Sequence, residues 1–367
     1  MSNSLKIGII GTRGIPNRYG GFETFAAQIS PRLVARGHQV FVYCSHDQAY
    51  RQATINGVNL VFRYNPESLL GTAGQFIYDL NCNLHSRIHP FDVILHLGYT
   101  SDAVWTGLWS SRAKHLTNMD GMEWQRSKYA SPVQSYLKKA EKRAAKGSDM
   151  LIADSTAILD YLESHYPTPA RFISYGAEIP GSFDSTVQGR FVVDPYLYDL
   201  LIARAEPENN IEMAIEAKLG ENSAVPLLIF SNETNFGIRM KGRYRHEKMI
   251  RFEQANYLEE VLNSLRHYSR YYIHGHSAGG TNPSLLEAMA CGCRILAHDN
   301  RFNRSVLAGN AGFYKDALQL TDLLKQNWSV EEFLPQTQKN LEAIRTNHHW
   351  DFITDEYERA FYKAQEL

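Results

Sequence analysis

Hydrophobic residues in this chain occur in short runs that alternate with longer stretches of helical spacing. Residues 5–10 form an apolar run typical of a fully buried parallel strand. Residues 24–36 follow with apolar positions at helical spacing, and residues 40–43 form the next apolar run. The pattern therefore predicts a strand, a glycine-containing loop, a helix and a second strand.

The same alternation continues along the chain and predicts an α/β protein. A turn-rich segment at 175–181 separates two groups of predicted strands, and 367 residues suffice for two domains, each with its own core. The last residues are predicted to form a helix with Ile353, Tyr357 and Phe361 on one face. Further strands are predicted at 92–98, 115–121 and 149–155 before the turn-rich segment, and at 196–203, 226–231, 271–274 and 294–298 after it.

Composition narrows the class of protein. The chain has 38 basic and 39 acidic residues, a balance that does not favour nucleic-acid binding. It has no apolar run of about 18 residues, so no transmembrane helix is expected, and its first residues lack the layout of a signal peptide. Four cysteines are too few for a disulfide scaffold, and the spacing of Cys291 and Cys293 is tighter than that of usual zinc ligands. We expect a cytoplasmic protein without a metal.

Residues 274–292, HGHSAGGTNPSLLEAMACG, form the clearest candidate site. A glycine-rich turn leads into a short helical run, with Ser284 expected to cap the helix and Gly292 to supply its left-handed end. Free backbone N–H groups and the positive end of a helix dipole together favour a phosphate. Glu287, one turn further on, is placed to accept hydrogen bonds from sugar hydroxyls. The alternative is an ordinary loop with a buried helix behind it.

The loop after the first predicted strand offers a second place where a ligand can approach the backbone. Glycines stand at positions 8, 11, 14, 20 and 21, which does not match the dinucleotide fingerprint G-x-G-x-x-G, and no acidic residue ends the second strand. A nicotinamide enzyme is therefore disfavoured, whereas a phosphate or sugar could approach at Gly20 and Gly21.

Acidic residues follow two of the predicted strands. Asp120 lies near the end of residues 115–121, Glu123 follows shortly after it, and Asp154 comes at the end of 149–155. Because open α/β sheets bind ligands beyond the carboxyl ends of their strands, these side chains are expected to face a ligand. Alternatively, Asp120 caps the helix that follows it.

Residues 133–146 are predicted to form a helix with a basic face. Five lysines and arginines lie there against the single acid Glu141. This face suits anionic lipid or a lipid-diphosphate acceptor at a membrane surface; the alternative is a solvated face with no partner.

Several of these segments resemble one family. GGTNPSLLEAMACG resembles the donor-binding signature of retaining glycosyltransferases of the GT-B fold, of the group 1 (family 4) type. GTRGIPNRYGGFETF, NMDGMEWQRSKY and ARAEPENNIE resemble its rhamnosyltransferase-like subgroup. The resemblance implies two Rossmann-like domains facing across a cleft, an acceptor domain at 1–180 and a nucleotide-sugar domain at 181–348. A C-terminal helix at 349–367 would cross back to the first domain.

The resemblance also assigns roles to individual residues. Arg204 would neutralise the donor diphosphate and Glu287 would hold the ribose. Gly279 and Asn209 stand where the family usually has a glutamate and a lysine, so a cation such as Lys241 or Arg243 could assist. His276 and Asn303 would either reach the sugar or serve as core or capping residues. The expected donor contacts are Gly20, Gly21, Arg204, Asn209, His276, Gly280, Thr281, Asn282, Ser284, Leu285 and Glu287.

On the acceptor side, the resemblance makes Asp120 the group that orients or deprotonates the acceptor hydroxyl, supported by Glu123, with Arg126 and Asp154 nearby. Asp120, Glu123 and Arg204 are thus the expected catalytic residues, and neither a metal nor another cofactor is expected.

The implied reaction is the transfer of L-rhamnose from dTDP-L-rhamnose, with retention, onto a lipid-linked or growing bacterial surface glycan. The expected enzyme is cytoplasmic, and its basic helix suits a peripheral position on the inner face of the plasma membrane. One alternative is a GT-B sugar-nucleotide epimerase or hydrolase. Another is a catalytically silent GT-B scaffold that binds nucleotide or a partner, and the residues at positions 279 and 209 keep that alternative open.

Overall fold

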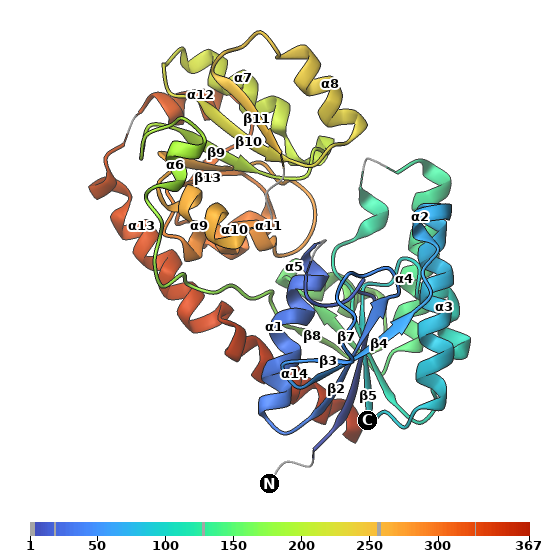
Figure 1. The fold of residues 1–367 in the computed structure, drawn as a ribbon. Coiled ribbons are helices and arrows are strands. Elements are labelled where there is room, and N and C mark those ends of the chain that lie inside the picture. Colours follow the sequence, from blue (N-terminus) through green and yellow to red (C-terminus); the bar gives the residue numbers. More distant parts are fainter. Residues whose placement is uncertain (1–3, 18–19, 127–128, 255–257, 327) are drawn as a thin grey trace. The chain divides into compact units, whose positions relative to one another are not determined.

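The computed structural model describes residues 4–17, 20–126, 129–254, 258–326 and 328–367 (Figure 1). The chain divides into two compact units. The first comprises residues up to Gln125, Tyr129–Tyr175 and Trp350–Leu367; the second comprises Gly176–His349 together with Arg126. The C-terminal helix therefore belongs to the first unit, as expected.

The first unit is built on an eight-stranded sheet. Its strand order is β3-β4-β2-β1-β5-β6-β7-β8, and every neighbouring pair is parallel except β3 and β4. The strands are β1 Lys6–Ile10, β2 Gln39–Ser45, β3 Thr54–Ile55, β4 Val58–Arg63, β5 Val93–Leu97, β6 Lys114–Asn118, β7 Met150–Ala153 and β8 Ala170–Phe172.

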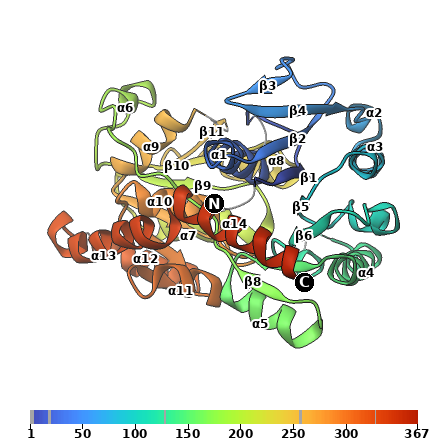
Figure 2. The ribbon, with the colours of Figure 1, turned by 90° about the horizontal axis from the view of Figure 1, so that it is seen from below.

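Helices cover both faces of this sheet. On one face, α1 (Gly21–Ala35) and α14 (Trp350–Glu366) pack side by side, and the rings of Phe25 and Tyr357 lie 5.0 Å apart (Figure 2). On the other face lie α3 (Ala73–Ile88) and α4 (Ser131–Gly147), with α2 (Glu67–Leu70) beside α3 (Figure 1). Covering both faces explains why β1 and β5 are almost wholly apolar and buried. The remaining elements of this unit are α5 Thr156–His165 and the 3₁₀ turns Ala103–Leu108 and Glu123–Gln125.

The second unit is built on a six-stranded, all-parallel sheet. Its strand order is β11-β10-β9-β12-β13-β14. Apolar side chains of α7 and α12 pack against one face, and α9, α10 and α11 lie along the other (Figure 1). The strands are β9 Asp199–Ile202, β10 Leu227–Ser231, β11 Ile250–Gln254, β12 Tyr271–His274, β13 Ile295–His298 and β14 Gly312–Tyr314. The helices are α6 Val187–Arg190, α7 Ile211–Glu221, α8 Asn235–Arg243, α9 Glu259–His267, α10 Pro283–Ala290, α11 Arg301–Leu307, α12 Ala317–Lys325 and α13 Val330–Ala343, with a 3₁₀ turn at Pro207–Asn209 and a π-helical turn at Ile344–His348.

Candidate functional site

The carboxyl edge of the sheet in the second unit collects most of the predicted donor residues. Arg204 follows β9, His276 follows β12, and the loop after β12 leads into α10. Strands β9 and β12 are hydrogen-bonded neighbours at the centre of the sheet, so their following loops begin side by side. This edge is where open parallel sheets bind ligands.

The beginning of α10 is open to a ligand. Gly279 has a φ of +108°, which favours glycine, and no atom lies within 4 Å of where its Cβ would stand. The side chain of Asn282 accepts a hydrogen bond from the Ser284 backbone N–H, so Asn282 is the N-cap. The expectation that Ser284 caps the helix is wrong, because Pro283 already occupies its first position. The expected left-handed end is confirmed, since Gly292 has a φ of +69°.

The loop after β12 is held against the turn that follows Arg204. A Cβ at Gly275 would lie 2.2 Å from the Asn209 carbonyl oxygen, so only glycine allows this approach. Ser277 donates from its backbone N–H (3.0 Å) and its hydroxyl (2.8 Å) to the Glu208 carbonyl oxygen. These contacts fix the loop that carries His276 beside the turn that carries Arg204.

Arg204 and Asn209 differ in what they offer a ligand. Arg204 is exposed, whereas Asn209 is buried and donates its side-chain amide to the Arg204 carbonyl oxygen at 2.8 Å. Asn209 thus shapes the turn around the arginine. Of the two suggested additional cations, Arg243 is ion-paired with Glu212.

Two stacked histidines lie at the end of β12. The rings of His274 and His276 are 4.5 Å apart, and in the described part of the chain neither nitrogen of His274 has a hydrogen-bond partner, nor does Nδ1 of His276. Burial lowers the pKa of His276 to about 4, with smaller contributions from neighbouring arginines that include Arg204. His276 is therefore a neutral imidazole. Buried polar atoms without partners are uncommon, and their presence here favours a polar ligand.

Asn303 belongs to the support of this loop. Its side-chain amide donates to the carbonyl oxygens of His276 (3.0 Å) and His298 (2.8 Å). Of the two roles considered for Asn303, the geometry favours the capping role.

The buried side chain of Arg266 forms an ion pair with Glu287. Its carboxylate Oε2 accepts a short hydrogen bond from Arg266, which also donates to the Ser284 hydroxyl at 3.3 Å. The Ser284 hydroxyl in turn lies 2.6 Å from the Tyr272 hydroxyl. Nothing in the sequence motif indicated this arginine, because it stands on α9, 21 residues before Glu287.

The acidic residues of the first unit lie at the carboxyl edge of its own sheet. Asp120 has a φ of +50° and its backbone N–H donates to the Asn118 side chain at 2.9 Å. Helix α4 begins after Ala130, so Asp120 does not cap it. Glu123 and Asp154 are each 8% exposed. Asp120 and Glu123 follow β6 and Asp154 follows β7, two neighbouring strands, so the sheet brings these acids to one edge.

Gly20 and Gly21 lie at the beginning of α1. Gly20 is its N-cap and Gly21 its first residue. The Glu23 carboxylate accepts from the Arg13 backbone N–H at 2.8 Å and so folds the preceding loop back onto the helix.

The remaining predicted site residues lie in the second unit. Leu285 is fully buried in α10, and Gly280 and Thr281 lie in the turn before that helix. Arg126 groups with the second unit.

The predicted basic helix is confirmed as α4. Its buried side includes Leu137 and the Glu141 carboxylate, which accepts from the hydroxyls of Tyr161 and Tyr166 at 2.7 Å each. Its exposed side carries Lys138, Lys139, Lys142, Arg143 and Lys146. Among the residues described, no helix is long and apolar enough to cross a membrane.

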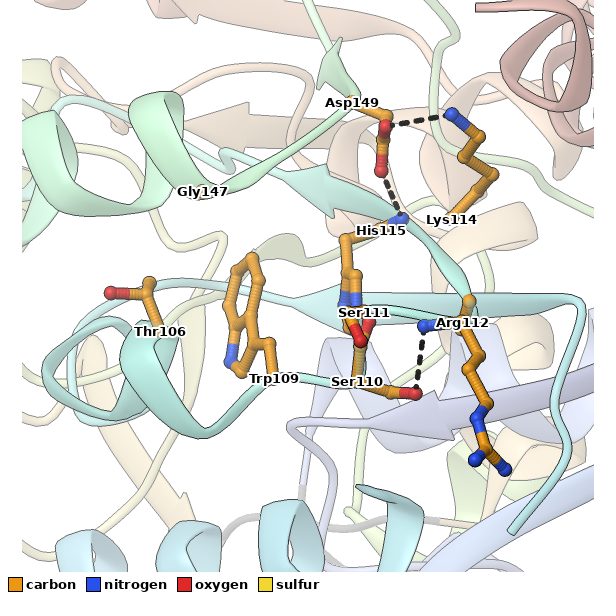
Figure 3. Close-up of a pocket in the computed structure, with 10 residues that line it drawn as sticks. Thr106, Trp109, Ser110, Ser111, Arg112, Lys114, His115, Gly147 and Asp149 are labelled. Carbon is orange, nitrogen blue, oxygen red and sulfur yellow. Dashed lines mark hydrogen bonds and ion pairs between the residues drawn. The ribbon is translucent and has the colours of Figure 1, made fainter. Parts of the chain in front are cut away.

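A hollow of about 320 Å³ lies at the opposite edge of the first sheet, where β6 and β7 begin (Figure 3). Trp109 and His115 form its wall, and Lys114 is ion-paired with Asp149 beside it at 3.2 Å. No predicted site residue lines this hollow.

The described part of the chain contains no group of three or more His, Cys, Asp or Glu side chains arranged to hold a metal. Cys291 and Cys293 are both buried, and the Cys293 thiol donates to the Arg266 carbonyl oxygen at 3.2 Å.

Comparisons with known proteins agree with this architecture. A family profile described as "Domain of unknown function (DUF1972)" matches residues 5–89 and 107–178. A comparison with curated proteins gave no match.

Solved structures match the whole chain. Sucrose-phosphate synthase from Thermosynechococcus elongatus is 14% identical, with a TM-score of 0.79 and 98% of each chain covered. The HepE protein of Anabaena, in complex with UDP and glucose, is 13% identical, with a TM-score of 0.77 and coverage of 98% of this chain and 100% of that one. A glycosyltransferase from Rickettsia africae is 12% identical, with a TM-score of 0.72 and 99% of each chain covered. The fold is therefore the GT-B fold, as the sequence predicted.

Proposed function

We propose that this protein is a glycosyltransferase that moves a hexosyl group from a nucleoside diphosphate sugar to a hydroxyl acceptor. The observation that carries the proposal is the edge of the second sheet, where Arg204, the neutral His276 and the open beginning of α10 follow adjoining strands. A cation, backbone N–H groups and the positive end of a helix dipole together suit a diphosphate.

The donor diphosphate is the leaving group, and it gains charge as the glycosidic bond breaks. Arg204 supplies charge and hydrogen bonds, and the positive end of the α10 dipole supplies further charge, where the charge of the leaving group develops; this is the largest contribution they can make to the rate. Gly280, Thr281 and Asn282 form the turn at which the donor reaches the helix, the buried Leu285 packs behind it, and Glu287 accepts from the ribose hydroxyls. Solved structures of HepE with UDP and with UDP-glucose support a donor of this class.

The acceptor is assigned to the first unit. Asp120, at the carboxyl end of β6, orients the acceptor hydroxyl or takes its proton, and Glu123 supports it. Asp154, which follows β7, completes the acceptor side in this unit, and Gly20 and Gly21 leave the backbone at the beginning of α1 open to a ligand. The exposed basic face of α4 suits a lipid-diphosphate acceptor or an anionic membrane surface.

In its finer form, the proposal is retaining transfer of L-rhamnose from dTDP-L-rhamnose to a lipid-linked or growing bacterial surface glycan, without a metal. Its support is the resemblance of three sequence segments to the rhamnosyltransferase-like subgroup and of a fourth to the donor-binding signature of the wider family. Incubation with dTDP-rhamnose and a lipid-diphosphate acceptor, followed by NMR of the product, tests it. A rhamnosyl product that keeps the anomeric configuration of the donor supports the finer form. Transfer of a different sugar would contradict rhamnose as the transferred group. An inverted anomeric centre in the product would contradict a retaining mechanism.

One observation favours a non-catalytic scaffold as a second candidate. Residue 279 is a glycine and has no side chain, and the Asn209 side chain donates to the Arg204 carbonyl oxygen. The carboxylate and the ammonium group that the family usually has at these two positions are therefore missing from the carboxyl edge of the second sheet. A protein that binds nucleoside diphosphate but turns over no donor would support that candidate. Donor breakdown without an acceptor would instead indicate an epimerase or hydrolase.

A further inference from the structure

Arg266 is a charged side chain inside the second unit. It stands near the end of α9 and is 2% exposed. Its guanidinium donates to Glu287, to the Ser284 hydroxyl at 3.3 Å and to the Asn263 side chain at 3.0 Å. All these partners belong to the same unit.

Burying this charge requires a counter-charge. Arginine stays protonated in proteins, and a buried charge without a partner is strongly destabilising. In the described part of the chain, Glu287 is the one carboxylate in an ion pair with Arg266. The pair is asymmetric, because the Glu287 side chain is 36% exposed. One end of the pair is thus fixed in the interior and the other end reaches the surface.

The pairing leaves part of the Glu287 carboxylate available. Oε2 is engaged by the arginine, whereas Oε1 makes no hydrogen bond within the described residues. A carboxylate that is anchored through one oxygen presents the other in a fixed direction, so it loses less rotational freedom when it accepts a hydrogen bond. The same guanidinium contacts Ser284 in the first turn of α10, which couples Glu287 to the beginning of the helix.

We propose that Arg266 is a positioning residue that aims the Glu287 carboxylate at a sugar hydroxyl of the bound nucleotide. The inference rests on the proposed function, in which Glu287 faces the ribose. Arg266 does not touch the ligand itself. It acts by holding one carboxylate oxygen and by fixing the Ser284 side chain behind the anion site.

The test compares ligands that differ by one hydroxyl. Dissociation constants are measured by calorimetry for UDP and dTDP, each against its 3′-deoxy analogue, with the wild-type protein and with Arg266→Met and Arg266→Lys. A hydrogen bond to a charged group corresponds to about tenfold or more in affinity, so the wild type should prefer the ligand that has the hydroxyl by that factor. Arg266→Met should reduce the preference to nearly one, and Arg266→Lys should restore part of it.

Arg270→Met is the matched control. Arg270 is also buried, at 7% exposure, but its guanidinium pairs with Asp199 and Glu221 at the other end of β12. The Arg270 variant should lose stability yet keep the wild-type preference between the two ligands. A purely structural role for Arg266 would weaken both ligands equally, and then the ratio would stay unchanged.

The outcomes separate the positioning role of Arg266 from the proposed function. A preference for the hydroxyl that persists in Arg266→Met overturns the positioning role and leaves the proposed function standing. A wild-type protein that binds nucleoside diphosphate without preferring the hydroxyl also overturns the positioning role alone. A wild-type protein that binds no nucleoside diphosphate overturns the proposed function, and this inference with it.

Discussion

The side chain of Asn282 accepts a hydrogen bond from the Ser284 backbone N–H at 2.9 Å, and it thereby caps α10 at the point where the proposed diphosphate binds. The Asn282 carbonyl oxygen accepts from the backbone N–H groups of Leu285 and Leu286 at 3.0 and 3.3 Å, so Asn282 also holds the rest of the first turn. Helix stability and anion binding therefore depend on the same residue.

Substitutions of Asn282 should separate these two roles. Asn282→Ala should lower the free energy of unfolding by about 0.5–2 kcal/mol, because the cap is lost. Asn282→Asp should keep the cap but weaken nucleoside diphosphate binding, because a carboxylate would face the phosphates. Denaturant unfolding and calorimetric binding check the two effects. Equal affinity of Asn282→Asp and wild type would mean that no anion binds at this helix.

Arg204→Ala should reduce turnover by about a hundredfold or more, because it removes a charge that stabilises the leaving diphosphate. The fold should be little affected, since the side chain is exposed. Steady-state kinetics with a nucleotide-sugar donor measure the effect. Arg345→Ala, at a side chain 59% exposed on the surface of the same unit, is the control and should keep the wild-type rate. A near-normal rate for Arg204→Ala would contradict its role.

Glu287→Ala should both cripple donor use and destabilise the protein, because it leaves the buried Arg266 charge without its carboxylate. Glu287→Gln keeps an acceptor for Arg266 and should retain more of the stability while still losing donor affinity. Comparing the unfolding midpoints and donor KM values of the two variants checks this. Wild-type kinetics in both variants would remove Glu287 from the site.

Stability should fall in acid because of His115. Burial, assisted by nearby His96, lowers the pKa of His115 from 6.5 to about 4, and its ring bonds His96 at 2.8 Å. Between these pH values the unfolded chain binds a proton that the folded protein does not. The stability present above pH 6.5 is therefore lost as the pH falls toward 4, by on the order of 3 kcal/mol.

The variant His115→Gln tests this origin. Its unfolding free energy should depend less on pH between 4 and 6.5 than that of the wild type. His165→Gln, at an exposed histidine, should follow the wild-type curve. Parallel curves for wild type and His115→Gln would assign the acid sensitivity to other groups.

The sequence predicted the order of strands and helices around both candidate sites because apolar runs flanked by glycine are local signals. The strand predicted at 271–274 is β12, and the helix predicted at 133–146 lies within α4. Helix α3 was not predicted, since Ile77, Leu84 and Ile88 are exposed on its outer side and obscure the usual apolar spacing. Strand β11 at the sheet edge was also missed, because it alternates apolar with charged and polar residues.

The sequence predicted the residues of the candidate site that belong to recognisable motifs, but not the residues that hold them in place. The positions of Arg204, His276 and Glu287 along the chain indicated where a ligand would bind. The support behind them comes from residues that meet only in the folded protein. Arg266 reaches Glu287 from another helix, and whether Asn209 turns inward or toward a ligand depends on the turn that surrounds it. The first is a contact between residues far apart in the sequence, and the second is a choice between side-chain orientations. Neither produces a periodic pattern of hydrophobic residues that sequence analysis could detect.

The most direct test of the central claim is the release of nucleoside diphosphate from dTDP-, UDP- and GDP-sugars, measured with and without a lipid-diphosphate acceptor. We predict release from one donor that depends on the acceptor, with dTDP-rhamnose as the expected donor. Release that is equal without acceptor would contradict transfer and indicate hydrolysis or epimerisation. No release from any donor, with nucleotide still bound, would contradict catalysis and leave the binding scaffold.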